Sequence, residues 1–325
     1  MKTDIFHQLH NDGLITQDEL TATSRQEETR LLSLHWDLRS LLYSGILMLA
    51  TGIGILIYKN IDAIGHLTVV VVTGLLSAIC IGYCIKKSAP YGRYKVESPN
   101  LWFDYILLLG CLLMVTFLGY LQFRFHVFGM RWGLATFVPM VLLFGMAYYF
   151  DHKGVLSLAI TAMGAWLGVA VDPVKFIRSD NLGDESYITS GVILGVVLSI
   201  MYVISGRVNV KSHFSLTYKN FGIHVLMIAL ICGMLNGKND VFWWLLVLAV
   251  VAVWHFMESI RDASFYFLLF TVLYSYIGLS GFIIKLLLDG SFNEGAMYML
   301  IFYFIGSAIG AIALLRHYNH KFNLR

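Results

Sequence analysis

The stretch GILMLATGIGILIYKN, residues 45–60, contains Gly52 and Gly54, which are spaced like the first two glycines of a dinucleotide-binding fingerprint. That fingerprint requires a third glycine three positions later, in a turn between a strand and a helix. The position holds Ile57, and no charge or turn interrupts the run from Leu41 to Tyr58. A helix of this length rises about 27 Å, close to the roughly 30 Å hydrocarbon core of a bilayer. The stretch therefore predicts a membrane-spanning helix.

The composition of the whole chain agrees with a lipid environment. Of its 325 residues, 58% are hydrophobic and only 13% are charged, whereas soluble domains carry about 25% charged residues. The mean hydropathy is +0.71. A net charge of +3, with scattered basic residues, excludes an extended nucleic-acid surface. The lipid bilayer is the expected partner, and nucleic acid is not.

Successive apolar runs predict an all-α, polytopic membrane helix bundle with about ten transmembrane helices. The expected domains are a short helical cytoplasmic head (1–38), the transmembrane bundle (39–316) and a cytoplasmic tail (317–325). Short connections between runs predict antiparallel neighbours. The expected spans are 40–58, 66–85, 102–121, 132–150, 154–171, 187–206, 219–236, 241–258, 263–284 and 295–315.

The distribution of Lys and Arg predicts the orientation. If the head lies inside, strict alternation of the spans places 16 of the 23 basic residues on the inner side and 7 on the outer side. Because cytoplasmic loops are enriched in Lys and Arg, both termini are expected on the cytoplasmic side of the membrane.

The head contains a helix-start signal. Thr16 and Glu19 are spaced as a capping box, in which the side chains satisfy backbone N–H groups at a helix start. The segment has too few apolar residues for an independent core. We therefore expect the head to dock on the membrane domain or on a cytoplasmic protein partner, and a homo-oligomer is a further hypothesis.

Glycines recur at helical spacing within several spans. Small residues spaced about one or two turns apart let helix backbones approach closely in a membrane, and this is the role predicted for them. A substrate passage lined by bare backbone is the alternative. The candidate packing glycines are Gly45, Gly52, Gly54, Gly164, Gly168, Gly191, Gly195, Gly306 and Gly310.

Candidates for chemistry lie near span ends. No ionisable residue falls at a predicted span centre, which argues against proton or sodium coupling. His255 and Glu258 are three residues apart and share a helix face, so they are weak candidates for an acid/base pair or a metal site. An ion-pair cluster with Arg261 and Asp262 is the alternative interpretation. No cofactor or metal ion is predicted. Outer-loop residues form a candidate outward cavity: Asn60, Asp62, Asp172 and Asp240.

Three segments carry a resemblance to a known family: NDGLITQDEL in the head, LHWDLRSLLYSGILMLATGIGILIYKN at the first span, and IDAIGH after it. They resemble the bacterial predicted membrane proteins grouped as domain of unknown function 2157. The resemblance covers about the first 90 residues and implies a helical head, a glycine-bearing first span and an Asn after it, here Asn60. The family commonly has an aromatic residue next, and this chain has Ile61. The resemblance implies a bacterial cytoplasmic (inner) membrane as the location, but no activity.

Three functions remain open. The first is a transporter of small neutral or amphipathic molecules, on the general plan of carriers built from two five-helix repeats. The second is a non-catalytic envelope scaffold or sensor that signals through its head. The third is a membrane-embedded lipid-modifying enzyme that would use His255 and Glu258. We expect a non-enzymatic role more than an enzymatic one.

Overall fold

The computed structural model describes residues 65–129, 131–171, 185–208, 211–236, 240–289 and 294–323, with isolated positions 16, 17, 48, 52, 55 and 59. The chain divides into two compact units, Met1–Val69 and Val70–Arg325. In the first unit, positions 48, 52, 55 and 59 are helical, and the rest of the predicted head and first span lies outside the described residues.

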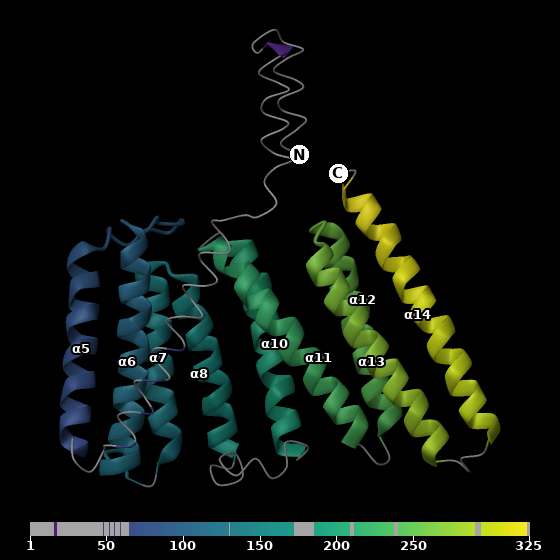
Figure 1. The fold of residues 1–325 in the computed structure, drawn as a ribbon, viewed down its shortest axis with the longest axis horizontal. Coiled ribbons are helices and arrows are strands. Elements are labelled where there is room, and N and C mark those ends of the chain that lie inside the picture. The colour runs from purple at the N-terminus through teal and green to yellow at the C-terminus, as the bar shows by residue number, and fades with distance from the viewer. Residues whose placement is uncertain are drawn as a thin grey trace. The chain divides into compact units, whose positions relative to one another are not determined.

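The described part of the chain is helical, with no strand (Figure 1). Its helices match the nine predicted spans after the first, with ends that differ by at most five residues except at the C-terminus. They are α5 (His66–Lys87), α6 (Leu101–Phe125), α7 (Trp132–Phe150), α8 (Lys153–Val171), α10 (Glu185–Val208), α11 (Ser215–Asn236), α12 (Val241–Arg261), α13 (Phe265–Asp289) and α14 (Glu294–Asn323), with the 3-10 helix η1 (Ser212–Phe214) before α11.

Eight of the described helical segments are long and apolar enough to cross a membrane, and α8 contributes a shorter apolar segment, Lys153–Val169. This confirms a polytopic helical membrane protein, with the expected number of about ten as an approximation. Neighbours in the chain are also neighbours in space: α6 packs on α7, α7 on α8, α8 on α10, and α10 on α11.

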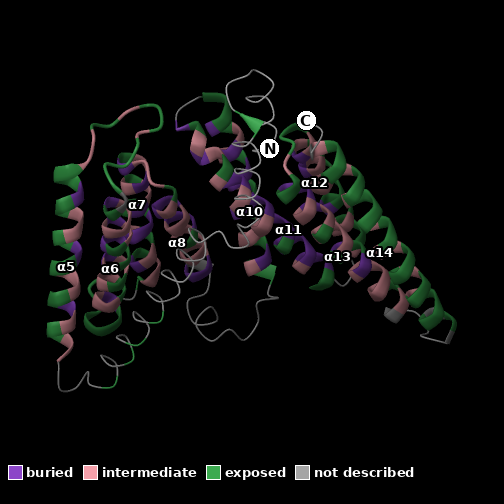
Figure 2. Ribbon diagram, turned by 45° about the horizontal axis from the view of Figure 1, so that its top comes forward, coloured by how far each residue is buried: buried purple, intermediate pink, exposed green. Residues whose placement is uncertain are grey.

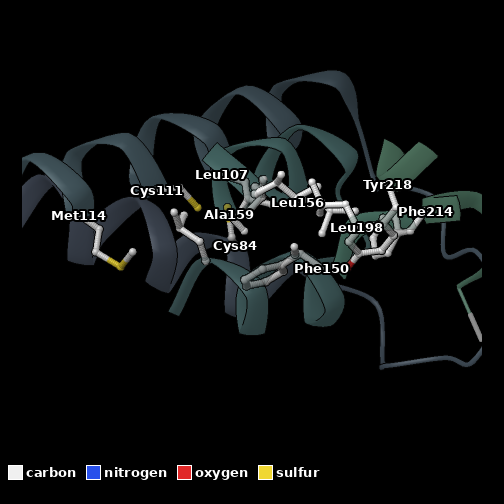
Figure 3. Packing of buried hydrophobic residues seen from close by; sticks show 14 of the residues in the cluster. Cys84, Leu107, Cys111, Met114, Phe150, Leu156, Ala159, Leu198, Phe214 and Tyr218 are labelled. Atoms are coloured by element: carbon white, nitrogen blue, oxygen red, sulfur yellow. The ribbon is translucent and has the colours of Figure 1, made fainter. Parts of the chain in front are cut away.

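The first hydrophobic core lies between α5, α6, α7, α8, α10 and α11. Figure 3 shows Cys84 from α5, Leu107 from α6, Leu156 from α8 and Tyr218 from α11 gathered in one cluster, and all four are fully or almost fully buried. A second cluster joins α11 to α12 and α13 through residues such as Met227, Leu248 and Phe267. Helix α11 therefore contributes residues to both hydrophobic clusters of the second unit.

Burial is uneven among the helices. Of the apolar window in the segment Ser212–Asn236, 61% is buried, whereas none of the window in Met297–Phe322 is buried. In Figure 2, α14 is accordingly mostly exposed. Because lipid chains solvate apolar side chains, this exposure is compatible with a membrane helix.

Candidate functional site

One end of the second unit collects buried charge. At this end, called the polar end here, α5, α7, α10, α12 and α14 finish and α6, α8, α11 and α13 begin, as alternation along the chain requires (Figure 1). Lys211 and Lys219 are 0% and 2% exposed there. Buried lysines are rare and need partners, so their surroundings define the site.

The first group, called the Asp151 cluster, forms where α7 turns into α8. Asp151 ends α7 in the left-handed conformation, with φ of 60°. This turn buries its carboxylate, and Oδ2 lies 3.1 Å from Lys211 Nζ. Oδ2 also accepts a hydrogen bond of 2.5 Å from the Val96 N–H. Both charges have no exposed side-chain area, so this is a fully desolvated ion pair.

Lys211 ties the segment 88–100 to the helices. Its Nζ donates to the Tyr94 carbonyl over 3.3 Å, and its backbone N–H donates to the Arg93 carbonyl over 3.0 Å. The ammonium also lies 5.1 Å from the centroid of the Tyr91 ring. Lys211 therefore holds the connecting segment through both its ammonium group and its backbone.

The other oxygen of Asp151 has a different environment. Oδ1 lies 2.6 Å from His213 Nε2, but the two atoms are not aligned for a hydrogen bond, and neither has another partner among the described residues. Beside them, His152 Nδ1 accepts a hydrogen bond from the Val155 N–H over 3.1 Å. Burial lowers the pKa of His152 below its usual value, although Asp104, with Oδ1 3.6 Å from Nε2, opposes that shift.

The second group, called the α10–α12 ion cluster, comprises Tyr202, Lys219, Glu258, Arg261 and Asp262. The Tyr202 hydroxyl donates to Glu258 Oε2 over 2.8 Å and lies 3.5 Å from Asp262 Oδ2. Lys219 Nζ donates to Asp262 Oδ2, and Arg261 Nη2 donates to Glu258 Oε2 over 2.7 Å. Two carboxylates and two cations are thus joined across three helices.

A lateral groove follows the same three helices. It has a volume of about 360 Å³ and is lined from α10 by Val196, Ser199, Ile200, Val203 and Ile204, from α11 by Leu226, and from α12 by Val251 and Trp254. The lining is almost entirely apolar. It could hold the apolar part of a small molecule next to the charged groups at the polar end.

The predicted pair His255 and Glu258 lies at this end, but the structure does not join the two side chains. Glu258 binds Tyr202 and Arg261 instead. His255 is 2% exposed, neither ring nitrogen has a hydrogen-bond partner in the described part of the chain, and the ring packs against Trp254 with centroids 4.6 Å apart. The described residues contain no group of three or more metal-ligating side chains, and the acid/base role stays a prediction.

The predicted outward cavity is mostly outside the described residues, because Asn60, Asp62 and Asp172 all fall there. Asp240 is described. It is exposed immediately before α12 and makes no side-chain capping hydrogen bond. The convergence of these four residues stays a prediction.

The predicted packing glycines have different surroundings. A Cβ on Gly195 would lie 2.6 Å from Leu226 Cβ, and one on Gly191 would lie 3.0 Å from Ala229 Cβ, so α10 approaches α11 closely. A Cβ on Gly164 would lie 3.4 Å from Leu194. Gly168 is buried in α8, and Gly45 and Gly54 lie outside the described residues. No described atom lies within 4 Å of such a Cβ at Gly52, Gly306 or Gly310.

The sequence alone does not single out the members of both clusters that come from distant parts of the chain. Asp151 lies in the short connection between the predicted spans 132–150 and 154–171, and Lys211 and Lys219 are two of the 16 basic residues expected on the inner side. The one local signal was the presence of Lys219 within a predicted span. Tyr202 gave no signal, because a tyrosine near a span end is also typical of the interface.

Comparison with known proteins gives one match. Residues 7–156 match the model of a family described as a predicted membrane protein, DUF2157. This confirms the resemblance and extends it from about residue 90 to residue 156. The matched range includes Asp104 and Asp151, whereas Lys211 and the α10–α12 ion cluster follow it. No curated protein and no solved structure matches the chain.

Proposed function

We propose that this multi-pass membrane protein carries small neutral or amphipathic molecules across a bacterial inner membrane. One observation carries the proposal: an apolar groove and an ion cluster are built on the same three helices, α10, α11 and α12. The groove suits the apolar part of a substrate. The ion cluster would hold the three helices together at the polar end. Its ion pairs could be replaced by hydrogen bonds to water when the helices separate.

Ion pairs are well suited to a reversible closure. Apolar contacts within the bilayer have no hydrophobic drive to open or close, whereas charges gain hydration when they separate at the membrane face. Asp262 is already 31% exposed and Arg261 68% exposed, so water reaches part of the cluster. Opening would therefore need only a local separation of α12 from α10 and α11.

The basic residues support an orientation in which the polar end faces the cytoplasm. Lys86, Lys153, Arg207, Arg316 and Lys321 lie at or near helix ends on this side, and cytoplasmic loops favour Lys and Arg. Both termini would then be cytoplasmic. A protein partner for the head and a homo-oligomer stay predictions.

Transport is tested with the full chain in proteoliposomes preloaded with a panel of neutral and amphipathic fluorophores. We expect faster release of at least one fluorophore than from vesicles without protein. Val203→Trp would fill the groove and should abolish the gain. Val250→Trp is the matched control, because Val250 is 62% exposed on α12 and does not line the groove, and it should release the dye like the wild type.

Closure is tested with a Tyr202→Cys, Asp262→Cys pair in a chain whose four native cysteines are replaced by alanine. A short thiol cross-linker should stop release, and a reducing agent should restore it. Release that continues in the cross-linked protein would reject the cluster as the closure. Equal release from wild-type, Val203→Trp and empty vesicles across the panel would reject transport itself.

A further inference from the structure

A second cavity opens at the polar end, away from the groove. This cleft has a volume of about 550 Å³ and lies between the segment 95–100, the start of α6, the turn from α7 to α8, and η1. Its lining includes Lys95, Glu97, Asp104, Asp151, His152 and Lys153. In contrast to the groove, a large part of its lining is polar.

The free charges around the cleft have both signs. The Asp151 charge is compensated by Lys211, and the lowered pKa of His152 favours its neutral form. Lys153 then contributes a positive charge and Asp104 a negative one, and Lys95 and Glu97 form an exposed pair 3.9 Å apart. A ligand that is only an anion or only a cation would meet repulsion, whereas a zwitterion can satisfy both signs.

The wall next to Lys153 favours an anionic group. Lys153 and Gly154 begin the 19-residue helix α8, and they line the cleft. The N-terminus of a helix carries a partial positive charge and unpaired N–H groups, and it attracts phosphate. The lysine adds a full positive charge at the same place.

The floor of the cleft provides acceptors for a cationic group. Asp151 has a fully buried side chain and lines the cleft, and its Oδ1 has His213 Nε2 at 2.6 Å but no aligned hydrogen-bond donor among the described residues. Asp104 is 32% exposed at its side chain and lies at the same wall as His152. An ammonium group would add a donor to the Asp104 carboxylate, whose Oδ1 already accepts a hydrogen bond of 2.5 Å from Ser98 Oγ, and would lie close to the Asp151 charge.

Exposed aromatic residues place this cleft at the level of lipid headgroups. Tyr91 and Tyr94 of the connecting segment are 55% and 77% exposed, and Trp102 at the start of α6 is 74% exposed. Tyrosine and tryptophan concentrate at the membrane–water interface, where their rings contact both phases. The nearest abundant molecules with a phosphate and an ammonium are therefore the lipids themselves.

We infer that this cleft binds the headgroup of a zwitterionic phospholipid, with its phosphate at Lys153 and the N-terminus of α8 and its ammonium at Asp104, beside the buried Asp151. The site is independent of the groove and of the transport proposal, because the two cavities share no lining residue. Free phosphoethanolamine has the same chemistry, so the experiment separates the two sources.

The test uses the full chain in nanodiscs that contain equal amounts of phosphatidylethanolamine and anionic phosphatidylglycerol. After extraction into detergent, native mass spectrometry measures the lipid retained. We expect phosphatidylethanolamine to be enriched about tenfold, as one charge-assisted contact would give. Asp104→Asn should remove this preference, whereas Lys153→Gln should reduce retention of both lipids. Lys86→Gln, which changes a lysine at the end of α5 outside the cleft, should behave like the wild type.

Three results would overturn the inference. The first is equal retention of both lipids by the wild type, and the second is unchanged retention in both cleft variants. The third is saturable binding of free phosphoethanolamine without enrichment of the lipid, which would make the ligand a soluble molecule. Circular dichroism of each variant checks that it is folded. If Asp104→Asn does not fold, lipid retention by Lys153→Gln still tests the inference.

Discussion

Two buried lysines, eight positions apart in the chain, are held in opposite ways. Lys211 and its partner Asp151 have no exposed side-chain area, and the pair also binds the segment 88–100. Lys219 is as deeply buried, but its partner Asp262 is 31% exposed and shares its contacts with Tyr202 and Arg261. The first pair is sealed, and the second pair is open to water on one side.

The contrast distinguishes an ion pair with a structural role from an ion pair that can separate. A sealed pair cannot exchange its partner for water without the loss of several contacts, because uncompensated charge in the interior is very unfavourable. The open pair can lose one contact while its exposed partner becomes hydrated. We therefore assign Asp151 and Lys211 to the stability of the bundle, whereas Lys219 and Asp262 have the exposure that the proposed closure needs.

The largest expected effect tests the sealed pair. Asp151→Asn leaves the Lys211 charge buried without a counter-ion, and we expect a loss of about 3–5 kcal/mol of stability. Thermal or denaturant unfolding in one fixed detergent measures it. A second change, Lys211→Met, removes the buried charge and should recover most of the loss. An Asp151→Asn protein as stable as the wild type would show that the pair is not sealed.

The next effect tests the helix pair α10 and α11, which includes Lys219 and is connected through Lys211. A Cβ at position 195 would lie 2.7 Å from the Cα of Leu226, so Gly195→Ala must separate α10 from α11. We expect a loss of about 1–3 kcal/mol, typical of overpacking. Gly306→Ala is the control in α14, where such a Cβ meets no described atom, and alanine is also the better helix former. Equal losses in both variants would remove the packing argument.

A smaller loss is expected from the open pair. Asp262→Asn removes the partner of Lys219, but Asp262 is partly exposed and water can reach the site. We expect a loss of about 1 kcal/mol, clearly below that of Asp151→Asn under the same conditions. Losses of equal size would contradict the contrast between the two lysines.

The smallest effect is a pH dependence beside the sealed pair. Because the pKa of His152 is lowered in the folded state, the unfolded chain binds more protons as the pH falls through about 6.5. The contribution of His152 to stability is therefore present above this pH and is lost as the solution becomes more acidic. His152→Asn keeps an acceptor for the Val155 N–H and should weaken the acid sensitivity of unfolding between about pH 5 and 7.

The spans could be predicted because each depends on a local property. The run from Trp132 to Phe150 is apolar throughout, and α7 has the predicted limits. The main difference is at the C-terminus, where the predicted span ends at residue 315 and α14 continues to Asn323. A hydropathy pattern locates the part of a helix in lipid, but a helix can continue into water when its polar residues are good helix formers.

The clusters could not be predicted because they depend on contacts between distant residues. His255 and Glu258 have the spacing of a shared helix face, but Glu258 binds Tyr202, which precedes it by 56 positions. Asp151 and Lys211 are 60 positions apart, and their burial requires the segment 88–100 to fold over them. No residue near Lys211 in the sequence distinguishes it from a lysine that faces water.

The length of α14 has a practical consequence. The part beyond Leu315 contains Arg316, His320 and Lys321, and at 1.5 Å per residue it continues for about 12 Å past the apolar stretch. A fluorescent reporter joined to this end would be attached to a rigid helix instead of a flexible linker. Its angular freedom would be small, so polarised emission from it would follow the rocking of the last helix.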